Sequence, residues 1–98
     1  IENYRYVANG QEALDFLKKT PVHLVLSDYN MPVMDGLDLL REIRSTDSLA
    51  KLAFIMVSGF QDHSVVEQGA SLGMNNYLQK PFDTESLQHC VEKVFGRL

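Results

Sequence analysis

Three residues that could share one reaction each follow a segment that is predicted to be a strand. Asp28 follows the apolar run Val22–Leu26, Ser58 follows Ala53–Val57, and Lys80 follows Asn76–Gln79. A carboxylate, a hydroxyl and an amine supply a nucleophile, a hydrogen-bond donor and a cation. Such a set suits the transfer of a phosphoryl group onto the carboxylate, where catalysis is mainly positioning and neutralisation of charge.

Each of these residues also has an ordinary structural explanation. An aspartate after a strand most often caps the next helix or makes a turn, and Ser58-Gly59 is a common turn pair. Lys80 before a proline is usually a solvated charge, and Asp35-Gly36 is typical of a tight turn in which glycine takes a positive φ. The chemical interpretation therefore depends on whether the fold brings the three side chains together.

The elements that must position them alternate between strand-like and helix-like patterns. Predicted strands cover Tyr4–Ala8, Val22–Leu26, Ala53–Val57 and Asn76–Gln79, and predicted helices cover Asn9–Lys19, Leu37–Arg44, Ser64 to about Gly73, and Thr84 to Leu98. Asn9 with Glu12, and Ser64 with Glu67, have the spacing of a capping box. The last helix has the clearest apolar periodicity.

This order predicts an α/β fold with a parallel sheet and right-handed crossovers. The continuous apolar runs at Val22–Leu26 and Ala53–Val57 are typical of strands covered on both faces. Ligands of such sheets bind beyond the carboxyl ends of the strands, which is where Asp28, Ser58 and Lys80 fall.

Length and composition limit the remaining possibilities. The 98 residues are expected to form one domain, residues 1–98, and the net charge of −4 argues against direct binding to nucleic acid. We find no apolar stretch long enough to span a membrane and no signal peptide. The single cysteine, Cys90, excludes an internal disulfide and favours a cytoplasmic setting. His23, His63 and His89 do not have metal-ligand spacing, so packing or exposure explains them better.

Three segments of the sequence resemble a known family. Residues 28–36 (DYNMPVMDG), 57–59 (VSG) and 77–82 (YLQKPF) resemble the receiver domain of two-component response regulators, and CheY-like receivers in particular. The resemblance extends over all 98 residues with matching spacings. It implies a flavodoxin-like, doubly wound parallel sheet, of which four βα units are visible here.

The resemblance also implies a role for each site residue. Asp28 would be the phosphoacceptor, Asn30 would offer its backbone carbonyl to Mg²⁺, and Ser58 and Lys80 would contact the phosphoryl group. Tyr77 would be an aromatic switch that turns inward when Ser58 moves, although a half-exposed strand aromatic is the plainer interpretation. The Lys80–Pro81 peptide bond would be cis.

The implied partners are a sensor histidine kinase or phosphotransfer protein, and a downstream output protein or domain. The output partner would read the surface that runs from about Ser64 to Leu98. No membrane partner is implied. The protein would catalyse at most its own phosphorylation and dephosphorylation, so we do not expect an enzyme that acts on another substrate.

The chain departs from the family at its start. The family has a further strand and helix there, and that strand ends in an acidic pair that helps to hold Mg²⁺. Ile1-Glu2-Asn3 resembles the end of that helix, and neither Glu2 nor Glu12 can replace the pair, so Mg²⁺ binding is expected to be weak.

In the family order the absent strand lies between the first two strands seen here. We therefore expect a gap or unpaired edges, exposed apolar surface on the sheet face of the absent helix, and self-association through the open sheet. A protein interaction or dimerisation module that works without phosphorylation is the alternative function.

Overall fold

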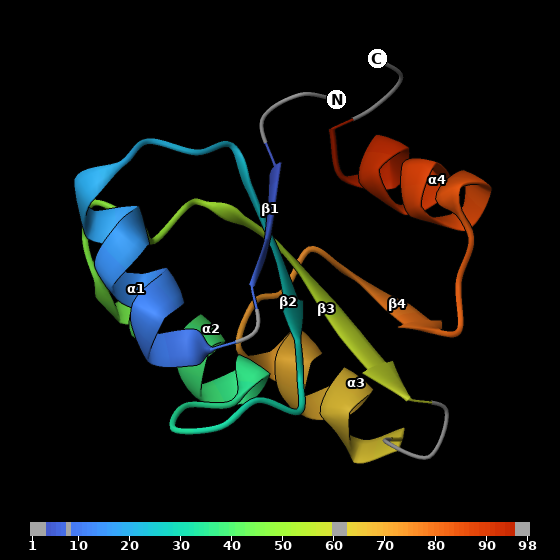
Figure 1. Cartoon of the computed structure of the whole chain (residues 1–98), viewed down its shortest axis with the longest axis horizontal. Helices are drawn as coiled ribbons and strands as arrows, with labels where there is room; N and C mark the ends of the chain where they lie inside the picture. Colours follow the sequence, from blue (N-terminus) through green and yellow to red (C-terminus); the bar gives the residue numbers. More distant parts are fainter. Residues whose placement is uncertain (1–3, 8, 60–62, 96–98) are drawn as a thin grey trace.

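A computed structural model describes residues 4–7, 9–59 and 63–95 of the chain. Four strands alternate with four helices in this part of the chain: β1 (Tyr4–Val7), α1 (Gly10–Lys19), β2 (Leu24–Asp28), α2 (Gly36–Ser45), β3 (Ala53–Gly59), α3 (His63–Ser71), β4 (Asn76–Lys80) and α4 (Thr84–Phe95). Figure 1 shows α4 on one side of the sheet, and α1, α2 and α3 on the other. Among these helices, none has the length and apolar character that crossing a membrane requires.

The sheet is parallel throughout and has the order β1-β2-β3-β4. The sequence left open a gap or unpaired edges at this place. Strand β1 pairs directly with β2, with Tyr4 opposite Leu24, so a gap between these two strands is ruled out. The pairing of β2 with β3 also sets the ends of β2. Leu24 is opposite Ala53 and Asp28 is opposite Val57, so the strand starts later than predicted and includes Asp28.

Two apolar clusters cover the two faces of β2 and β3. On one face Val25, Phe54 and Met56 pack against α1, α2 and α3. On the other face the side chains pack against Cys90 and Val91 of α4; they are Leu24, Leu26, Ile55 and Val57, each at most 1% exposed. The prediction of strands covered on both faces is confirmed. The prediction of exposed apolar surface is wrong for these residues, because α4 shields them.

The helix starts agree with the sequence in one case and differ in another. The Asn9 side chain accepts hydrogen bonds from the backbone N–H groups of Gln11 and Glu12, at 2.9 and 3.3 Å, and so caps α1 as predicted. Ser64 is not the residue before α3, because that helix already begins at His63 and Ser64 is an exposed residue of its first turn. Residues 60–62 lie outside the described part of the chain.

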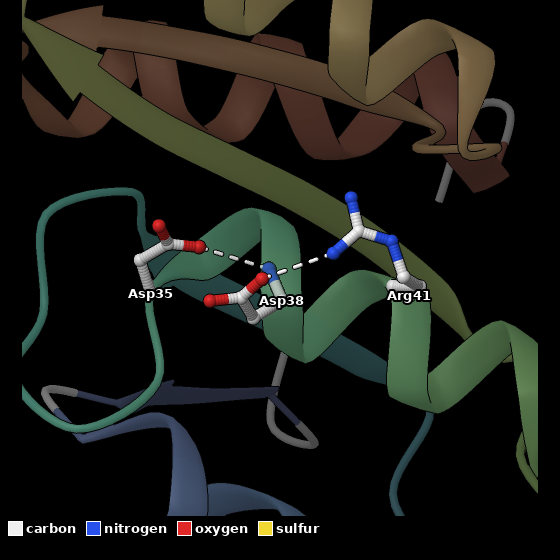
Figure 2. A network of polar contacts seen from close by, with 3 residues as sticks. All are labelled: Asp35, Asp38 and Arg41. Carbon is white, nitrogen blue, oxygen red and sulfur yellow. Dashed lines mark hydrogen bonds and ion pairs between the residues drawn. The ribbon is translucent and has the colours of Figure 1, made fainter.

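Helix α2 begins with a side-chain cap. The Asp35 carboxylate accepts a hydrogen bond from the backbone N–H of Asp38 at 2.9 Å, and Asp38 pairs with Arg41 at 3.0 Å (Figure 2). Gly36 follows the cap, but a positive φ is not what it provides, because Gly73 is the one described glycine with such an angle. A Cβ at Gly36 would lie 2.6 Å from the Asp28 carbonyl oxygen, so close approach to the backbone of β2 is what excludes a side chain.

The connection between β2 and α2 contains a tight turn at Val33. The Met34 N–H donates to the Pro32 carbonyl at 2.7 Å, and Val33 between them has a φ of 70°. A γ-turn with positive φ is rare and strained, and a β-branched residue fits it poorly. Because the Val33 side chain is 82% exposed, burial does not offset this strain.

Arg44 ties three segments together at the amino ends of the strands. Its guanidinium donates to the carbonyl oxygens of Leu52 at 2.6 Å, Gly73 at 2.7 Å and Ala50 at 3.2 Å, and to the Asn75 side-chain oxygen at 3.2 Å. Partial burial lowers the pKa of Arg44 from its ordinary value. The residue thus fixes the segments that lead into β3 and β4.

We predict that Val33→Asn stabilises the protein. Asparagine accepts a positive φ far better than valine, so the free energy of unfolding should rise by about 1 kcal/mol. Urea unfolding followed by far-ultraviolet circular dichroism measures the change. Val33→Thr is the control, because threonine keeps the β-branch and should stay close to the parent. An asparagine variant no more stable than the threonine variant would contradict strain at this turn.

We also predict that Arg44→Met lowers the free energy of unfolding by about 2 kcal/mol, because it leaves several backbone carbonyls without their charged donor while keeping an apolar stem. Arg41→Met is the matched control. Arg41 makes an exposed ion pair within one helix, and its loss should change stability by about 0.5 kcal/mol or less. The same urea experiment serves both variants. Equal effects would show that the Arg44 contacts add nothing specific.

Candidate functional site

Asp28 and Lys80 form an ion pair at the carboxyl ends of the strands. The Lys80 Nζ lies 2.6 Å from Asp28 Oδ1, and the two side chains are 46% and 15% exposed. The residues belong to β2 and β4, which flank β3 on either side. Neighbouring strands are about 4.8 Å apart, so the two backbones are separated by roughly 10 Å and the long lysine stem bridges the distance. The fold therefore brings together two of the predicted residues.

Ser58 lies on the strand between them. Asp28 is opposite Val57 and Lys80 is opposite Gly59, so Ser58 falls between these two levels at the same edge of the sheet. Its side chain is only 4% exposed. Because side chains alternate along a strand, Ser58 leans to the face of α1–α3, whereas Asp28 and Lys80 lean to the face of α4.

The loop after Asp28 is attached to the sheet by its backbone. The Tyr29 N–H donates to the Val57 carbonyl, and the Gly36 N–H donates to the Tyr29 carbonyl, both at 2.8 Å. Asn30 follows and is exposed. The peptide bond between Lys80 and the next residue, Pro81, is cis, as the sequence resemblance implies.

Ser27 is a residue of this region that sequence reasoning missed. Its side chain is fully buried, and its hydroxyl donates to the Asp28 carbonyl at 3.0 Å and lies 3.9 Å from the Met31 sulfur. These contacts hold the backbone of Asp28 and the start of the following loop. The available signal was a hydroxyl residue inside an otherwise apolar strand.

A metal ion would find few ligands here. The described residues contain no group of three or more His, Cys, Asp or Glu side chains that could hold one. Asp28 supplies one carboxylate, already paired with Lys80, and the Asn30 carbonyl is a second oxygen. Mg²⁺ requires near-octahedral oxygen coordination, so the described residues alone do not fit a magnesium site.

Tyr77, the predicted switch residue, is 40% exposed on β4. Tyr77 is opposite Met56 on β3, and Ser58 follows Met56 by two residues. Side chains two residues apart on a strand point to the same face, so Tyr77 and Ser58 are on the same face of the sheet. The strand is attached to α4 behind it. The Asn76 amide donates to the Cys90 carbonyl at 3.2 Å, and the Cys90 thiol lies 3.5 Å from the Tyr77 carbonyl.

Two titratable groups near α4 are shifted. Burial raises the pKa of the Cys90 thiol, which is consistent with a packing role for this residue. At the start of the helix, the Ser86 N–H donates to the Asp83 carboxylate at 2.8 Å, and this hydrogen bond lowers the pKa of Asp83. Asp83 therefore stays ionised and caps the helix just after the segment that carries Lys80.

Comparisons with known proteins agree with this geometry. Residues 1–92 match the family model of the response regulator receiver domain. The chain is 40% identical to a probable chemotaxis protein CheY of Rhizobium etli over 90 residues, which are 92% of this chain and 70% of that protein. It is 35% identical to chemotaxis protein CheY-3 of Vibrio cholerae over 98 residues, which are 100% of this chain and 75% of the relative.

Solved structures are similar as well. A response regulator from Chloroflexus aurantiacus superposes with a TM-score of 0.86 at 30% identity, covering 95% of this chain and 76% of that one. Another similar structure is the receiver domain of the sensor histidine kinase PA1611 from Pseudomonas aeruginosa, which has a magnesium ion coordinated in its active site cleft. It superposes with a TM-score of 0.80 at 30% identity, covering 92% of this chain and 74% of that one. The parallel α/β fold and the family match together show that this chain belongs to the response regulator receiver domain family.

Proposed function

We propose that Asp28 is the phosphoacceptor of this receiver domain and takes the phosphoryl group of a phosphohistidine on a sensor kinase or phosphotransfer protein. The observation that carries the proposal is the Asp28–Lys80 ion pair at the carboxyl end of a buried strand. A carboxylate oxygen of Asp28 attacks phosphorus, the new P–O bond forms, and the P–N bond to histidine breaks, leaving the imidazole as leaving group.

Lys80 and Ser58 assist in different ways. The ammonium group of Lys80 is already beside the attacking carboxylate, so it neutralises charge on the incoming phosphoryl group without a long movement. The Ser58 hydroxyl donates a hydrogen bond to a phosphoryl oxygen. Because Ser58 is buried on the face that it shares with Tyr77, its movement toward the phosphoryl group makes room for that ring to turn inward.

The output of this change is the surface made by α3, β4 and α4. Phosphorylation adds negative charge at the sheet edge, and the position of Tyr77 reports it to a downstream protein or domain. The activity is confined to phosphorylation and dephosphorylation of the domain itself, in the cytoplasm. The net charge of −4 favours a protein partner over nucleic acid.

Magnesium enters this proposal by analogy. The Pseudomonas aeruginosa receiver has a magnesium ion in its active site cleft. In the present chain Asp28 and the Asn30 carbonyl are the candidate ligands, and a single carboxylate that is already paired with a lysine should bind the ion weakly.

The same shortage of metal ligands favours a second candidate function. A receiver-like domain that binds Mg²⁺ poorly could serve as a protein interaction or dimerisation module that works without phosphorylation. Strands β1 and β4 are the outer strands of the sheet, so pairing with a second copy would use one of these edges. The labelling experiment below separates the two functions.

We predict that the protein gains the mass of one phosphoryl group when it is incubated with acetyl phosphate and Mg²⁺, and that Asp28→Asn abolishes the gain. Intact-protein mass spectrometry measures it. Asp35→Asn is the matched control, since Asp35 caps α2 and should leave labelling intact. Labelling that persists in Asp28→Asn would place the acceptor elsewhere. No labelling of the parent at any Mg²⁺ concentration would favour the interaction module.

We further predict that Lys80→Ala uncouples phosphorylation from the switch. In the parent, labelling should change the ring signals of Tyr77 in an NMR spectrum, and in Lys80→Ala they should stay as in the unlabelled protein. Stability should change by about 1 kcal/mol or less, because the lysine is half exposed. A variant that switches normally but unfolds readily would assign Lys80 to folding instead.

A further inference from the structure

A cavity lies at the amino ends of β2 and β3, whereas Asp28 lies at the carboxyl end of β2. Its volume is about 490 Å³, and it is lined by residues 17–22 and 47–52, which end α1 and lead into β2 and β3. Asp28 and Lys80 are at the carboxyl ends of β2 and β4, so the cavity is at the opposite edge of the sheet. Volumes of this size are typical of sites for small molecules.

The lining of the cavity combines apolar and cationic residues. Leu17 and Leu49, both buried, are among the apolar ones. Lys18, Lys19 and Lys51 also line it, and Asp47 is the single carboxylate of the lining, so three positive charges accompany one negative charge on a chain whose net charge is −4. Among the described residues none of these lysines takes part in an ion pair.

The two lysines of α1 have a partial explanation without a ligand. Lys18 and Lys19 occupy the last turn of α1, where positive charge compensates the negative end of the helix dipole. Lys51 is not on a helix and gains nothing from this effect. Its presence in the lining adds cationic charge beyond what the helix end requires.

The wall that carries Lys51 is held in place by contacts within the protein. Arg44 donates to the carbonyl oxygens of Ala50 at 3.2 Å and Leu52 at 2.6 Å, one on each side of that lysine. The Leu49 and Leu52 N–H groups bond to the carbonyls of Thr46 and Leu49 at 2.8 and 3.0 Å. The cavity is therefore formed before any ligand binds, which lowers the entropic penalty of binding.

We propose that this cavity binds a small organic anion with an apolar body, such as an aryl or alkyl carboxylate. The apolar part packs on Leu17 and Leu49, and the carboxylate faces the ammonium groups of Lys51 and Lys19. Asp28 needs none of these residues, either as phosphoacceptor or as a candidate Mg²⁺ ligand. The site is therefore independent of the phosphoryl chemistry. Binding requires both parts of the ligand, the apolar body and the negative charge.

Titration with 4-phenylbutyrate, followed by ¹H–¹⁵N NMR, tests the proposal. Amide signals of residues 17–22 and 47–52 should shift and saturate with a Kd on the order of 1 mM, as expected for a ligand of this size. The neutral amide of the same compound should bind at least about tenfold more weakly, because it lacks the charge that the lysines attract. Added salt should weaken the binding of the acid, since these lysines are exposed.

Two variants distinguish the effect of the lysines that line the cavity from the effect of net charge. Lys51→Glu should raise the Kd for 4-phenylbutyrate about tenfold, because one attraction becomes a repulsion. Lys93→Glu changes the net charge equally at an exposed position on α4 and should leave the Kd unchanged. Shifts outside the cavity, equal binding of acid and amide, or equal effects of the two variants would overturn the proposal. So would an acidic peptide that shifts these residues while 4-phenylbutyrate does not.

Discussion

The parallel register of β2, β3 and β4 is the constraint on which the candidate site depends. Asp28 is level with Val57 and Lys80 is level with Gly59, so a carboxylate and an amine end two strands that flank the same neighbour. The reach of lysine then determines the contact, because a shorter cation could not cross the width of β3. The 2.6 Å ion pair is a consequence of strand order and side-chain length together.

Burial of β2 and β3 on both faces is what makes this register rigid. A shift of one residue would exchange the two faces of each strand, placing Leu26 where Ser27 now lies. Ser27 adds a local contact within β2, since its hydroxyl donates to the carbonyl of Asp28. The Asp28 carboxylate is therefore held by packing that extends over the whole sheet, and the loop that follows can carry strain at Val33 without moving it.

Much of this could be predicted from the sequence, for identifiable reasons. The apolar runs predicted β2 and β3, and the alternation of elements predicted a parallel sheet with Asp28, Ser58 and Lys80 at one edge. Register and the direct pairing of β1 with β2 could not be predicted, because they depend on contacts between distant segments. The reason for a glycine at position 36 could not be predicted either. A side chain there would collide with the Asp28 carbonyl, and no local sequence pattern reveals that contact. The roles assigned to the five site residues rest on resemblance and stay predictions; these residues are Asp28, Asn30, Ser58, Tyr77 and Lys80.

The carboxyl and amino ends of the strands differ in how their polar groups are satisfied. At the carboxyl edge, polar groups stay partly accessible, and Lys80 balances the charge of Asp28 while leaving both side chains reachable from solvent. At the amino edge, Arg44 binds backbone carbonyls from two separate connections, and its donors replace the water that those carbonyls would otherwise need. A domain of this size has a modest core, so firm anchoring at the amino ends of the strands allows the loop after Asp28 to carry strain at Val33.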